Sequence, residues 1–141
     1  MMITRLLALS LTAMLFACAS NTPTTMSPSQ LAQDRGYELG EPVDRIMNYR
    51  LDGWNYINSQ SVIIHSGVNR DHLVTLRNRC HELMNTEAIA TTSTGNAMRA
   101  KFDAIIVSLD GLRPTRSAGN TRKCYIDSIY EISKIKTSDE E

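Results

Sequence analysis

Three histidines and an aspartate are the residues of this chain best suited to acid–base or metal chemistry. His65, His72 and His81 are separated by seven and nine residues, which matches no tight metal-ligand spacing. Folding could still bring two of them together beside Asp103, as in a small hydrolase or a metal-dependent enzyme, although ordinary surface or half-buried histidines are the simpler interpretation. Cys80 directly precedes His81, and a nearby imidazolium can activate a thiol. Adjacent residues of a strand point to opposite faces, however, so we do not expect a catalytic thiol here. The sequence therefore predicts no catalytic residue, no metal site and no cofactor, and an enzyme is the second hypothesis.

A second group of residues could form a binding surface. Residues 112–123 (LRPTRSAGNTRK) are locally cationic because they contain four basic side chains and no acidic one. The four are Arg113, Arg116, Arg122 and Lys123. Such a segment could contact an anionic polymer or lipid headgroups, although a solvated loop without a partner is the simpler interpretation. Trp54 and Tyr56 could also line a binding surface, but a lone tryptophan in a small domain more often belongs to the core.

The first 17 residues have the pattern of a secretory signal. Arg5 supplies a positive charge, and residues 6–16 (LLALSLTAMLF) form an uncharged, mostly apolar run behind it. The run is shorter than the about 20 residues that a membrane-spanning helix needs. Residues 15–17 (LFA) lead directly into Cys18, and this sequence resembles the lipobox of bacterial lipoproteins. The resemblance implies cleavage before Cys18 and lipidation of its thiol; the alternative is a buried cysteine in a core helix.

Lipidation would make a membrane the first partner of this protein. Each buried methylene contributes about 0.8 kcal/mol, so two or more acyl chains hold a protein stably on a bilayer. Residue 19 is alanine, whereas lipoproteins that stay at the inner membrane commonly carry aspartate there. We therefore expect the protein in the cell envelope, lipid-anchored to the outer membrane and facing the periplasm.

Composition divides the mature chain into a tether, one domain and a tail. Without residues 1–17 the chain keeps 14 basic and 15 acidic residues, and this balance offers no clustered basic face for nucleic acid. Residues 18–41 begin with a segment rich in Ser, Thr and Pro and are expected to form a flexible tether. Residues 42–136 are then one β-rich domain of common size, and residues 137–141 are an acidic tail.

Short β-branched or alternating runs follow one another through this domain, with turn residues between them. The expected strands are residues 43–51, 61–66, 72–76, 88–93, 103–109 and 123–132, with a turn at Asp52-Gly53. This pattern predicts a mainly β fold, namely a small antiparallel β-barrel or sandwich of about five to six strands.

The segment after the third of these strands admits two interpretations. Its apolar residues recur at helical spacing up to Met84. A strand through Leu76 followed by a short helix or helical turn near Cys80–Met84 satisfies most of the pattern. The alternative is one amphipathic helix over residues 70–84.

The last expected strand is irregular as well. Ile126, Ile129 and Ile132 recur every three residues, and a regular strand cannot place all three on one face. A β-bulge near Asp127 and Ser128 would restore the register, and a C-terminal helix is the alternative.

Several short motifs occur in an order that resembles a known family. They are RI (residues 45–46), Trp54, VII (62–64), HLVTLRNRC (72–80), DAIIV (103–107) and CYIDSI (124–129). Together they resemble a family of small bacterial lipoproteins classed as a domain of unknown function, over residues 43–132. The resemblance implies a disulfide between a central and a late cysteine, here Cys80 and Cys124, and it brings no established activity.

The cysteine count supports the same pairing. With Cys18 modified, Cys80 and Cys124 are left as an even pair in an exported domain, where small folds commonly carry disulfides. The alternative is two separate buried thiols. Because the chain carries no catalytic motif, the leading hypothesis for function is a non-enzymatic accessory or binding module of the periplasm that contacts another envelope component. The oligomeric state is not indicated.

Overall fold

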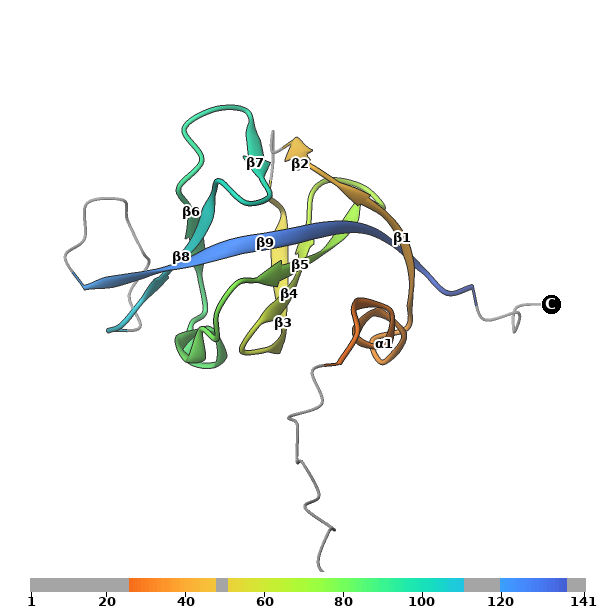
Figure 1. Cartoon of the computed structure of the whole chain (residues 1–141), viewed down its shortest axis with the longest axis horizontal. Coiled ribbons are helices and arrows are strands. Elements are labelled where there is room, and N and C mark those ends of the chain that lie inside the picture. Colours follow the sequence, from red (N-terminus) through yellow and green to blue (C-terminus); the bar gives the residue numbers. More distant parts are fainter. Residues whose placement is uncertain (1–25, 48–50, 111–119, 137–141) are drawn as a thin grey trace, which may run out of the picture.

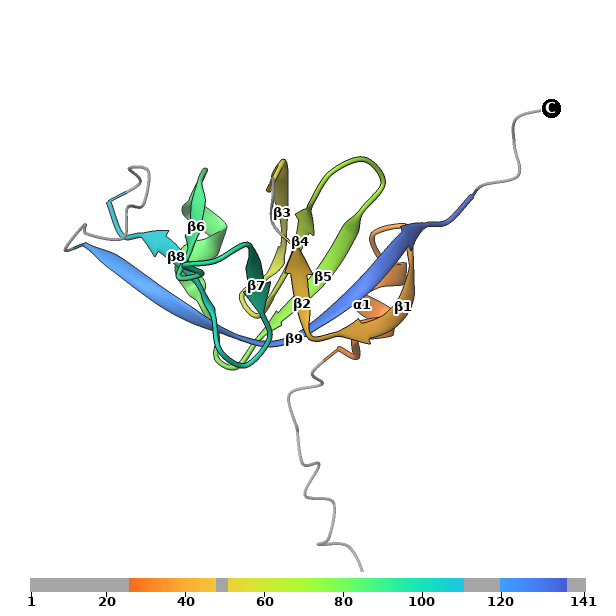
Figure 2. The ribbon, with the colours of Figure 1, turned by 90° about the horizontal axis from the view of Figure 1, so that it is seen from above.

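The computed structural model describes residues 26–47, 51–110 and 120–136. In chain order its elements are α1 (Pro28–Gln33), β1 (Tyr37–Val43), β2 (Arg45–Met47), β3 (Gly53–Asn58), β4 (Ser61–His65), β5 (Asp71–Leu76), the 3₁₀-helix η1 (His81–Asn85), β6 (Ile89–Thr91), β7 (Ala97–Arg99), β8 (Ala104–Ser108) and β9 (Thr121–Lys134). Seven strands form one antiparallel sheet in the order β3-β4-β5-β9-β8-β6, with β1 also on β9, while β2 and β7 pair separately. Figure 2 shows the large sheet curving into an open half-barrel. The predicted mainly β fold is confirmed.

The long strand β9 joins the two halves of this sheet (Figure 1). The Arg77 amide donates to the Tyr125 carbonyl over 3.0 Å, whereas the amide of the next residue in β9, Ile126, donates to the Asp103 carbonyl over 3.0 Å. Because successive residues of a strand direct their backbone groups to opposite edges, β5 lies on one edge of β9 and β8 on the other. Both β1 and β5 pair with the C-terminal half of β9, so β1 shares an edge with β8.

A β-bulge interrupts the pairing of β9 with β5. Thr75 pairs with Ser128 and Leu76 pairs with Ile126, which leaves Asp127 as the extra residue. The predicted bulge is confirmed, and the alternative of a C-terminal helix is wrong.

The bulge assigns the isoleucines of β9 to two cores on opposite faces of the sheet. Ile126 and Ile129 are buried in the main core, on what we call the inner face. Ile132 lies on the outer face in a second, smaller core, so the expectation that the bulge would place all three isoleucines on one face is wrong for Ile132, because the strand alternates regularly after Ile129. The same division occurs in β4, where Val62 belongs to the main core and its neighbour Ile63 to the second, as the alternation of a strand requires.

Helix α1 covers the outer core. Ser27 and Gln30 form a capping box at its start, with Pro28 in the first turn, and each of these residues favours a helix N-terminus. Leu31 and Ala32 are buried against the outer core. A helix of six residues is marginal alone, so this buried contact stabilises it.

This packing corrects the expected domain boundary. Residues 26–41 contain α1 and most of β1 and belong to the folded domain, so the prediction of a flexible tether through residue 41 and a domain beginning at residue 42 is wrong for them. The predicted signal, Cys18 and the rest of the tether fall in residues 1–25, outside the described residues, as does the tail at 137–141.

The segment from β5 to η1 is a strand followed by a helical turn, as predicted, and the alternative of one helix over residues 70–84 is wrong. β5 lies between β4 and β9 and pairs with both. Hydrogen bonds on both edges of a central strand outweigh the helical spacing of its side chains.

The expected turn at Asp52-Gly53 is also wrong. Gly53 pairs with His65 at the start of β3, and the Asp52 amide donates to the His65 carbonyl over 2.9 Å. The chain reverses instead at Ser59 and Gln60, between β3 and β4. The turn residues therefore mark the beginning of a strand that the sequence pattern did not predict.

The expected strand over residues 43–51 is replaced by two shorter pieces. β1 ends at Val43, and β2 leaves the large sheet to pair with β7. Residues 48–50 lie outside the described residues. The strands predicted at 61–66, 88–93 and 103–109 correspond to β4, β6 and β8.

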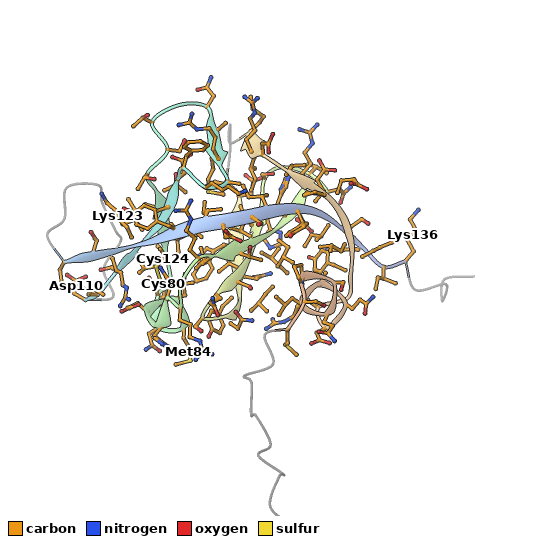
Figure 3. The ribbon with its side chains drawn as sticks, in the orientation of Figure 1. Cys80, Met84, Asp110, Lys123, Cys124 and Lys136 are labelled. Atoms are coloured by element: carbon orange, nitrogen blue, oxygen red, sulfur yellow. A yellow bond between two sulfur atoms is a disulfide. The ribbon has the colours of Figure 1, made fainter. Side chains whose placement is uncertain are left out.

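The predicted disulfide is present. Cys80 and Cys124 are bonded, with Cα atoms 6.0 Å apart and a sequence separation of 44. Both side chains are buried, and the bond ties the start of η1 to β9 (Figure 3). Two separate thiols, the alternative, are excluded.

Candidate binding cleft

A polar cleft of about 520 Å³ opens on the inner face at the β1 end of β9. Pockets of this volume commonly hold small ligands. β2, the β4–β5 loop, β5 and β9 contribute its walls, which include Arg45, Met47, Ser66, Arg70, His72 and Glu131. In Figure 1 this end of β9 lies beside β1, at the far end of the strand from β8.

The β4–β5 loop is shaped by hydrogen bonds that place Arg70 at the cleft. The Ser66 amide donates to the Arg70 carbonyl over 2.9 Å. Gly67 and Asn69 adopt positive φ angles of 94° and 57°, a region that glycine and asparagine occupy more readily than other residues. The Gly67 amide also donates to Asp52 Oδ2 over 2.8 Å. The loop is therefore attached to the start of β3 as well as to its own strands.

His72 lies in the wall of the cleft and is 8% exposed. The Ser66 hydroxyl donates to the Arg70 carbonyl and lies 3.3 Å from His72 Nδ1. The tautomer that satisfies both contacts at once carries its proton on Nδ1, so that Nδ1–H donates to the Ser66 oxygen and Nε2 is an acceptor; we assign this tautomer to His72. Among the described residues no group forms a hydrogen bond with Nε2. Nε2 is also not one of their fully buried polar atoms without a partner, so it reaches the solvent of the cleft.

Glu131 lies beside His72 on the inner face of the sheet, on the adjacent strand. The two residues are partners in the register of β5 and β9, and directly opposed side chains of an antiparallel pair lie about 5 Å apart at Cβ. Burial has the largest effect on the pKa of His72 and lowers it below its usual value near 6.5. The charges of Glu131 and Asp71 act to raise this pKa, and the charge of Arg70 acts to lower it further. The imidazole is therefore neutral at neutral pH, beside an exposed carboxylate.

This shift predicts a loss of stability in mild acid. The unfolded chain binds a proton on His72 at higher pH than the folded chain, so the free energy of unfolding falls as pH drops through about 6.5 and levels off below the folded pKa. Denaturant unfolding at about pH 7.5 and about pH 5 should show a smaller pH dependence in His72→Gln than in the parent. Met84→Gln, at an exposed site on η1 that carries no titrating group, is the control and should keep the parental dependence. Equal pH dependence in parent and His72→Gln would contradict this assignment.

His65 belongs to a separate cluster on the outer face. Its Nδ1 lies 2.6 Å from Asp71 Oδ1, and its Nε2 lies 3.1 Å from Asn55 Nδ2. Burial raises the pKa of Tyr37, and a hydrogen bond to Asp71 raises it further. The cluster joins β1, β3, β4 and β5 on the side of the sheet that α1 covers. It therefore stabilises the outer core, and His72 is the only one of these two histidines that lines the cleft.

The structure does not bring the histidines that were considered for an enzyme site together with Asp103. His65 and His72 occupy opposite faces, and His81 lies on η1. Asp103 Oδ2 accepts from the Arg99 amide over 2.7 Å and lies 3.6 Å from Arg99 Nε. Within the described ranges no group of three His, Cys, Asp or Glu side chains could hold a metal ion.

The residues considered for binding also lie apart from the cleft. Trp54 and Tyr56 are partly buried against the main core from β3, and Lys123 is exposed near the far end of β9 (Figure 3). Arg113 and Arg116 lie outside the described residues.

Arg122 has a structural partner beside the disulfide. Its Nη1 lies 2.6 Å from Glu82 Oε1. Burial acts to raise the pKa of Glu82, but its own backbone amide, Arg122 and His81 lower it more, so the net pKa is below the usual value. The pair holds η1 against β9. Arg122, which the sequence suggested for ligand binding, therefore has its charge paired with Glu82.

Comparison with known proteins places the chain in a family. A family of unknown function (DUF6491) matches residues 1–141. The chain belongs to this family. The resemblance to a domain of unknown function is thereby confirmed, and DUF6491 brings no activity with it. No curated protein and no solved structure matches the chain.

The cleft of this DUF6491 member was not predicted from the sequence. Its charged residues, Arg45, Arg70 and Glu131, come from β2, a hairpin loop and β9 and form no local motif. The only local signal is the run from Ser66 to His72, in which Gly67 and Asn69 mark a tight loop between two predicted strands.

No helix among the described residues has the length and apolar character to cross a membrane.

Proposed function

We propose that this protein is a lipid-anchored accessory module of the bacterial envelope, on the outer membrane and facing the periplasm, that binds another envelope component in its cleft. The observation that carries the binding role is the polar cleft of about 520 Å³, whose arginines and glutamate enter no ion pair among the described residues. Arg45, Arg70 and Glu131 are exposed and come from different elements, so their charged groups are accessible to a ligand in the cleft.

The N-terminal sequence supports the location. The charged start, the apolar run and the LFAC sequence before residue 19 resemble a lipoprotein signal. Helix α1 begins at Pro28, so the ten residues from Cys18 to Ser27 would span at most about 35 Å. A lipid on Cys18 would therefore hold the domain close to the membrane surface, where it would meet components of that surface first.

Photocrosslinking in intact cells tests the cleft as the binding surface. Met47 lines the cleft and is 53% exposed, and Met84 on η1 is 66% exposed at the other end of the domain. A photoreactive amino acid at position 47 is expected to give a discrete adduct with an envelope component, and the same amino acid at position 84 is not. Both positions are exposed, so neither replacement disturbs the core.

The comparison of the two positions decides the result. An adduct that forms at 84 and not at 47 would place the binding surface elsewhere. Absence of an adduct at both positions, with the protein expressed at its normal level, would contradict the binding role.

A further inference from the structure

The cleft offers charges of both signs to a ligand. Arg45 and Arg70 supply guanidinium donors, and Glu131 supplies a carboxylate. Asp71 also borders the cleft, but its carboxylate contacts His65 on the outer face. Among the described residues the ion pairs are His65–Asp71, Arg99–Asp103 and Arg122–Glu82, so the three cleft charges are not neutralised by one another.

His72 adds a neutral acceptor beside Glu131. In the tautomer that satisfies both contacts of Ser66, Nδ1–H donates to the Ser66 oxygen, and Nε2 has no partner among the described residues. One wall of the cleft therefore accepts hydrogen bonds, through Nε2 and the Glu131 carboxylate, whereas the arginines donate them. A ligand that fits must donate at one end and accept at the other.

We propose that the cleft binds a small zwitterion with a free ammonium and a free carboxylate, that is, an amino acid or a short peptide. The arginines pair with the carboxylate, since guanidinium groups match its geometry. Glu131 and His72 accept hydrogen bonds from the ammonium. The exposed side chain of Met47 gives the ligand an apolar contact. The inference rests on the proposed function, because it names the ligand class of the same cleft.

Glu131 is the residue that separates this ligand from a simple anion. An anion without an ammonium would place its charge near an unpaired carboxylate, and like charges at close range are unfavourable. A simple cation would meet the two arginines. The cleft thus discriminates against both by repulsion as well as by missing hydrogen bonds.

Calorimetry with the full chain purified in detergent tests the ligand class. The probes are leucine, leucyl-leucine, N-acetylleucine, which lacks the ammonium, and leucinamide, which lacks the carboxylate. Leucine or leucyl-leucine is expected to bind, and the better of the two distinguishes a free amino acid from a peptide. The two blocked probes should bind at least about tenfold more weakly, as the loss of one charged hydrogen-bonding group implies.

Matched charge-neutral variants assign the roles. Glu131→Gln should weaken leucine about tenfold or more and leave N-acetylleucine unchanged or tighter, whereas Arg70→Gln should weaken both. Glu87→Gln and Arg79→Gln, at exposed positions outside the cleft lining, are the controls and should bind like the parent. A general loss of folding would weaken every probe alike, so the selective effect of Glu131→Gln is specific to recognition of the ammonium.

Three results would overturn the inference: equal binding of leucine and N-acetylleucine to the parent, no binding of any zwitterionic probe, or controls that weaken as much as the cleft variants. A crosslinked partner at position 47 combined with no zwitterion binding would refute the ligand class and leave the proposed function standing. Zwitterion binding without any crosslinked partner would support the ligand class and refute the accessory role.

Discussion

The full chain with both Cys80 and Cys124 replaced by alanine is expected to lose about 4 kcal/mol of unfolding free energy. The disulfide closes a loop with a sequence separation of 44, and in the chain-entropy model a loop of that length restricts the unfolded ensemble by about this amount. Small domains are commonly stable by only about 5–15 kcal/mol. The double variant should therefore unfold at much lower denaturant concentration than the parent.

Reduction provides the matched control for this variant. The parent in excess reductant should lose a similar amount of stability, because the same loop is opened without any change in sequence. Thiol labelling of the unfolded, unreduced parent should find neither Cys80 nor Cys124 reactive. Two reactive thiols per chain, or a double variant as stable as the parent, would refute the contribution assigned to this bond.

Replacement of Cys18 by serine is expected to move most of the protein from the membrane fraction to the soluble fraction, or to leave an uncleaved precursor of higher mass. Serine offers no thiol for the thioether on which the anchor depends, and without acyl chains the described domain has no helix that could span the bilayer. Fractionation of cells followed by mass spectrometry of the N-terminal peptide measures both outcomes.

The Cys80/Cys124 double variant is the control for this experiment as well, since it keeps Cys18 and should stay with the membrane. A Cys18→Ser protein that matures and fractionates like the parent would end the proposal of a lipid anchor. The zwitterion site would be unaffected by that result, because it depends on the folded domain alone.

Features that depend on neighbours in the chain were predictable. The β-branched runs that became β4 and β8 are short and bounded by turn residues, so their strand character is visible locally. The spacing of Ile126 and Ile129 required either a helix or an extra residue in a strand, and Asp127 is that extra residue. The disulfide followed from the count of cysteines and the expected compartment.

Some local sequence signals are obscured by the composition of the residues around them. Ser27, Pro28 and Gln30 form a recognisable helix start, yet the surrounding Ser, Thr and Pro content suggested a tether. The helix is stable because Leu31 and Ala32 reach an outer core that exists only after β4, β5 and β9 have paired. The Asp52-Gly53 pair similarly indicated a turn, whereas pairing with His65 made it the start of β3.

The fold class, the central strands, the bulge and the cysteine pair were predictable, because each depends on residue type and spacing within a short stretch of chain. Long-range pairing instead sets the edge of β9 that β1 and β8 share, the position of α1 on the outer face, and the presence of Arg45, Arg70 and Glu131 with His72 in one cleft. These arrangements join segments far apart in the chain, and no pattern within one segment encodes its partner. The cleft arises where the pairing of β5 with β9 places His72 opposite Glu131, while β2 leaves the sheet and carries Arg45 to the same end of the half-barrel.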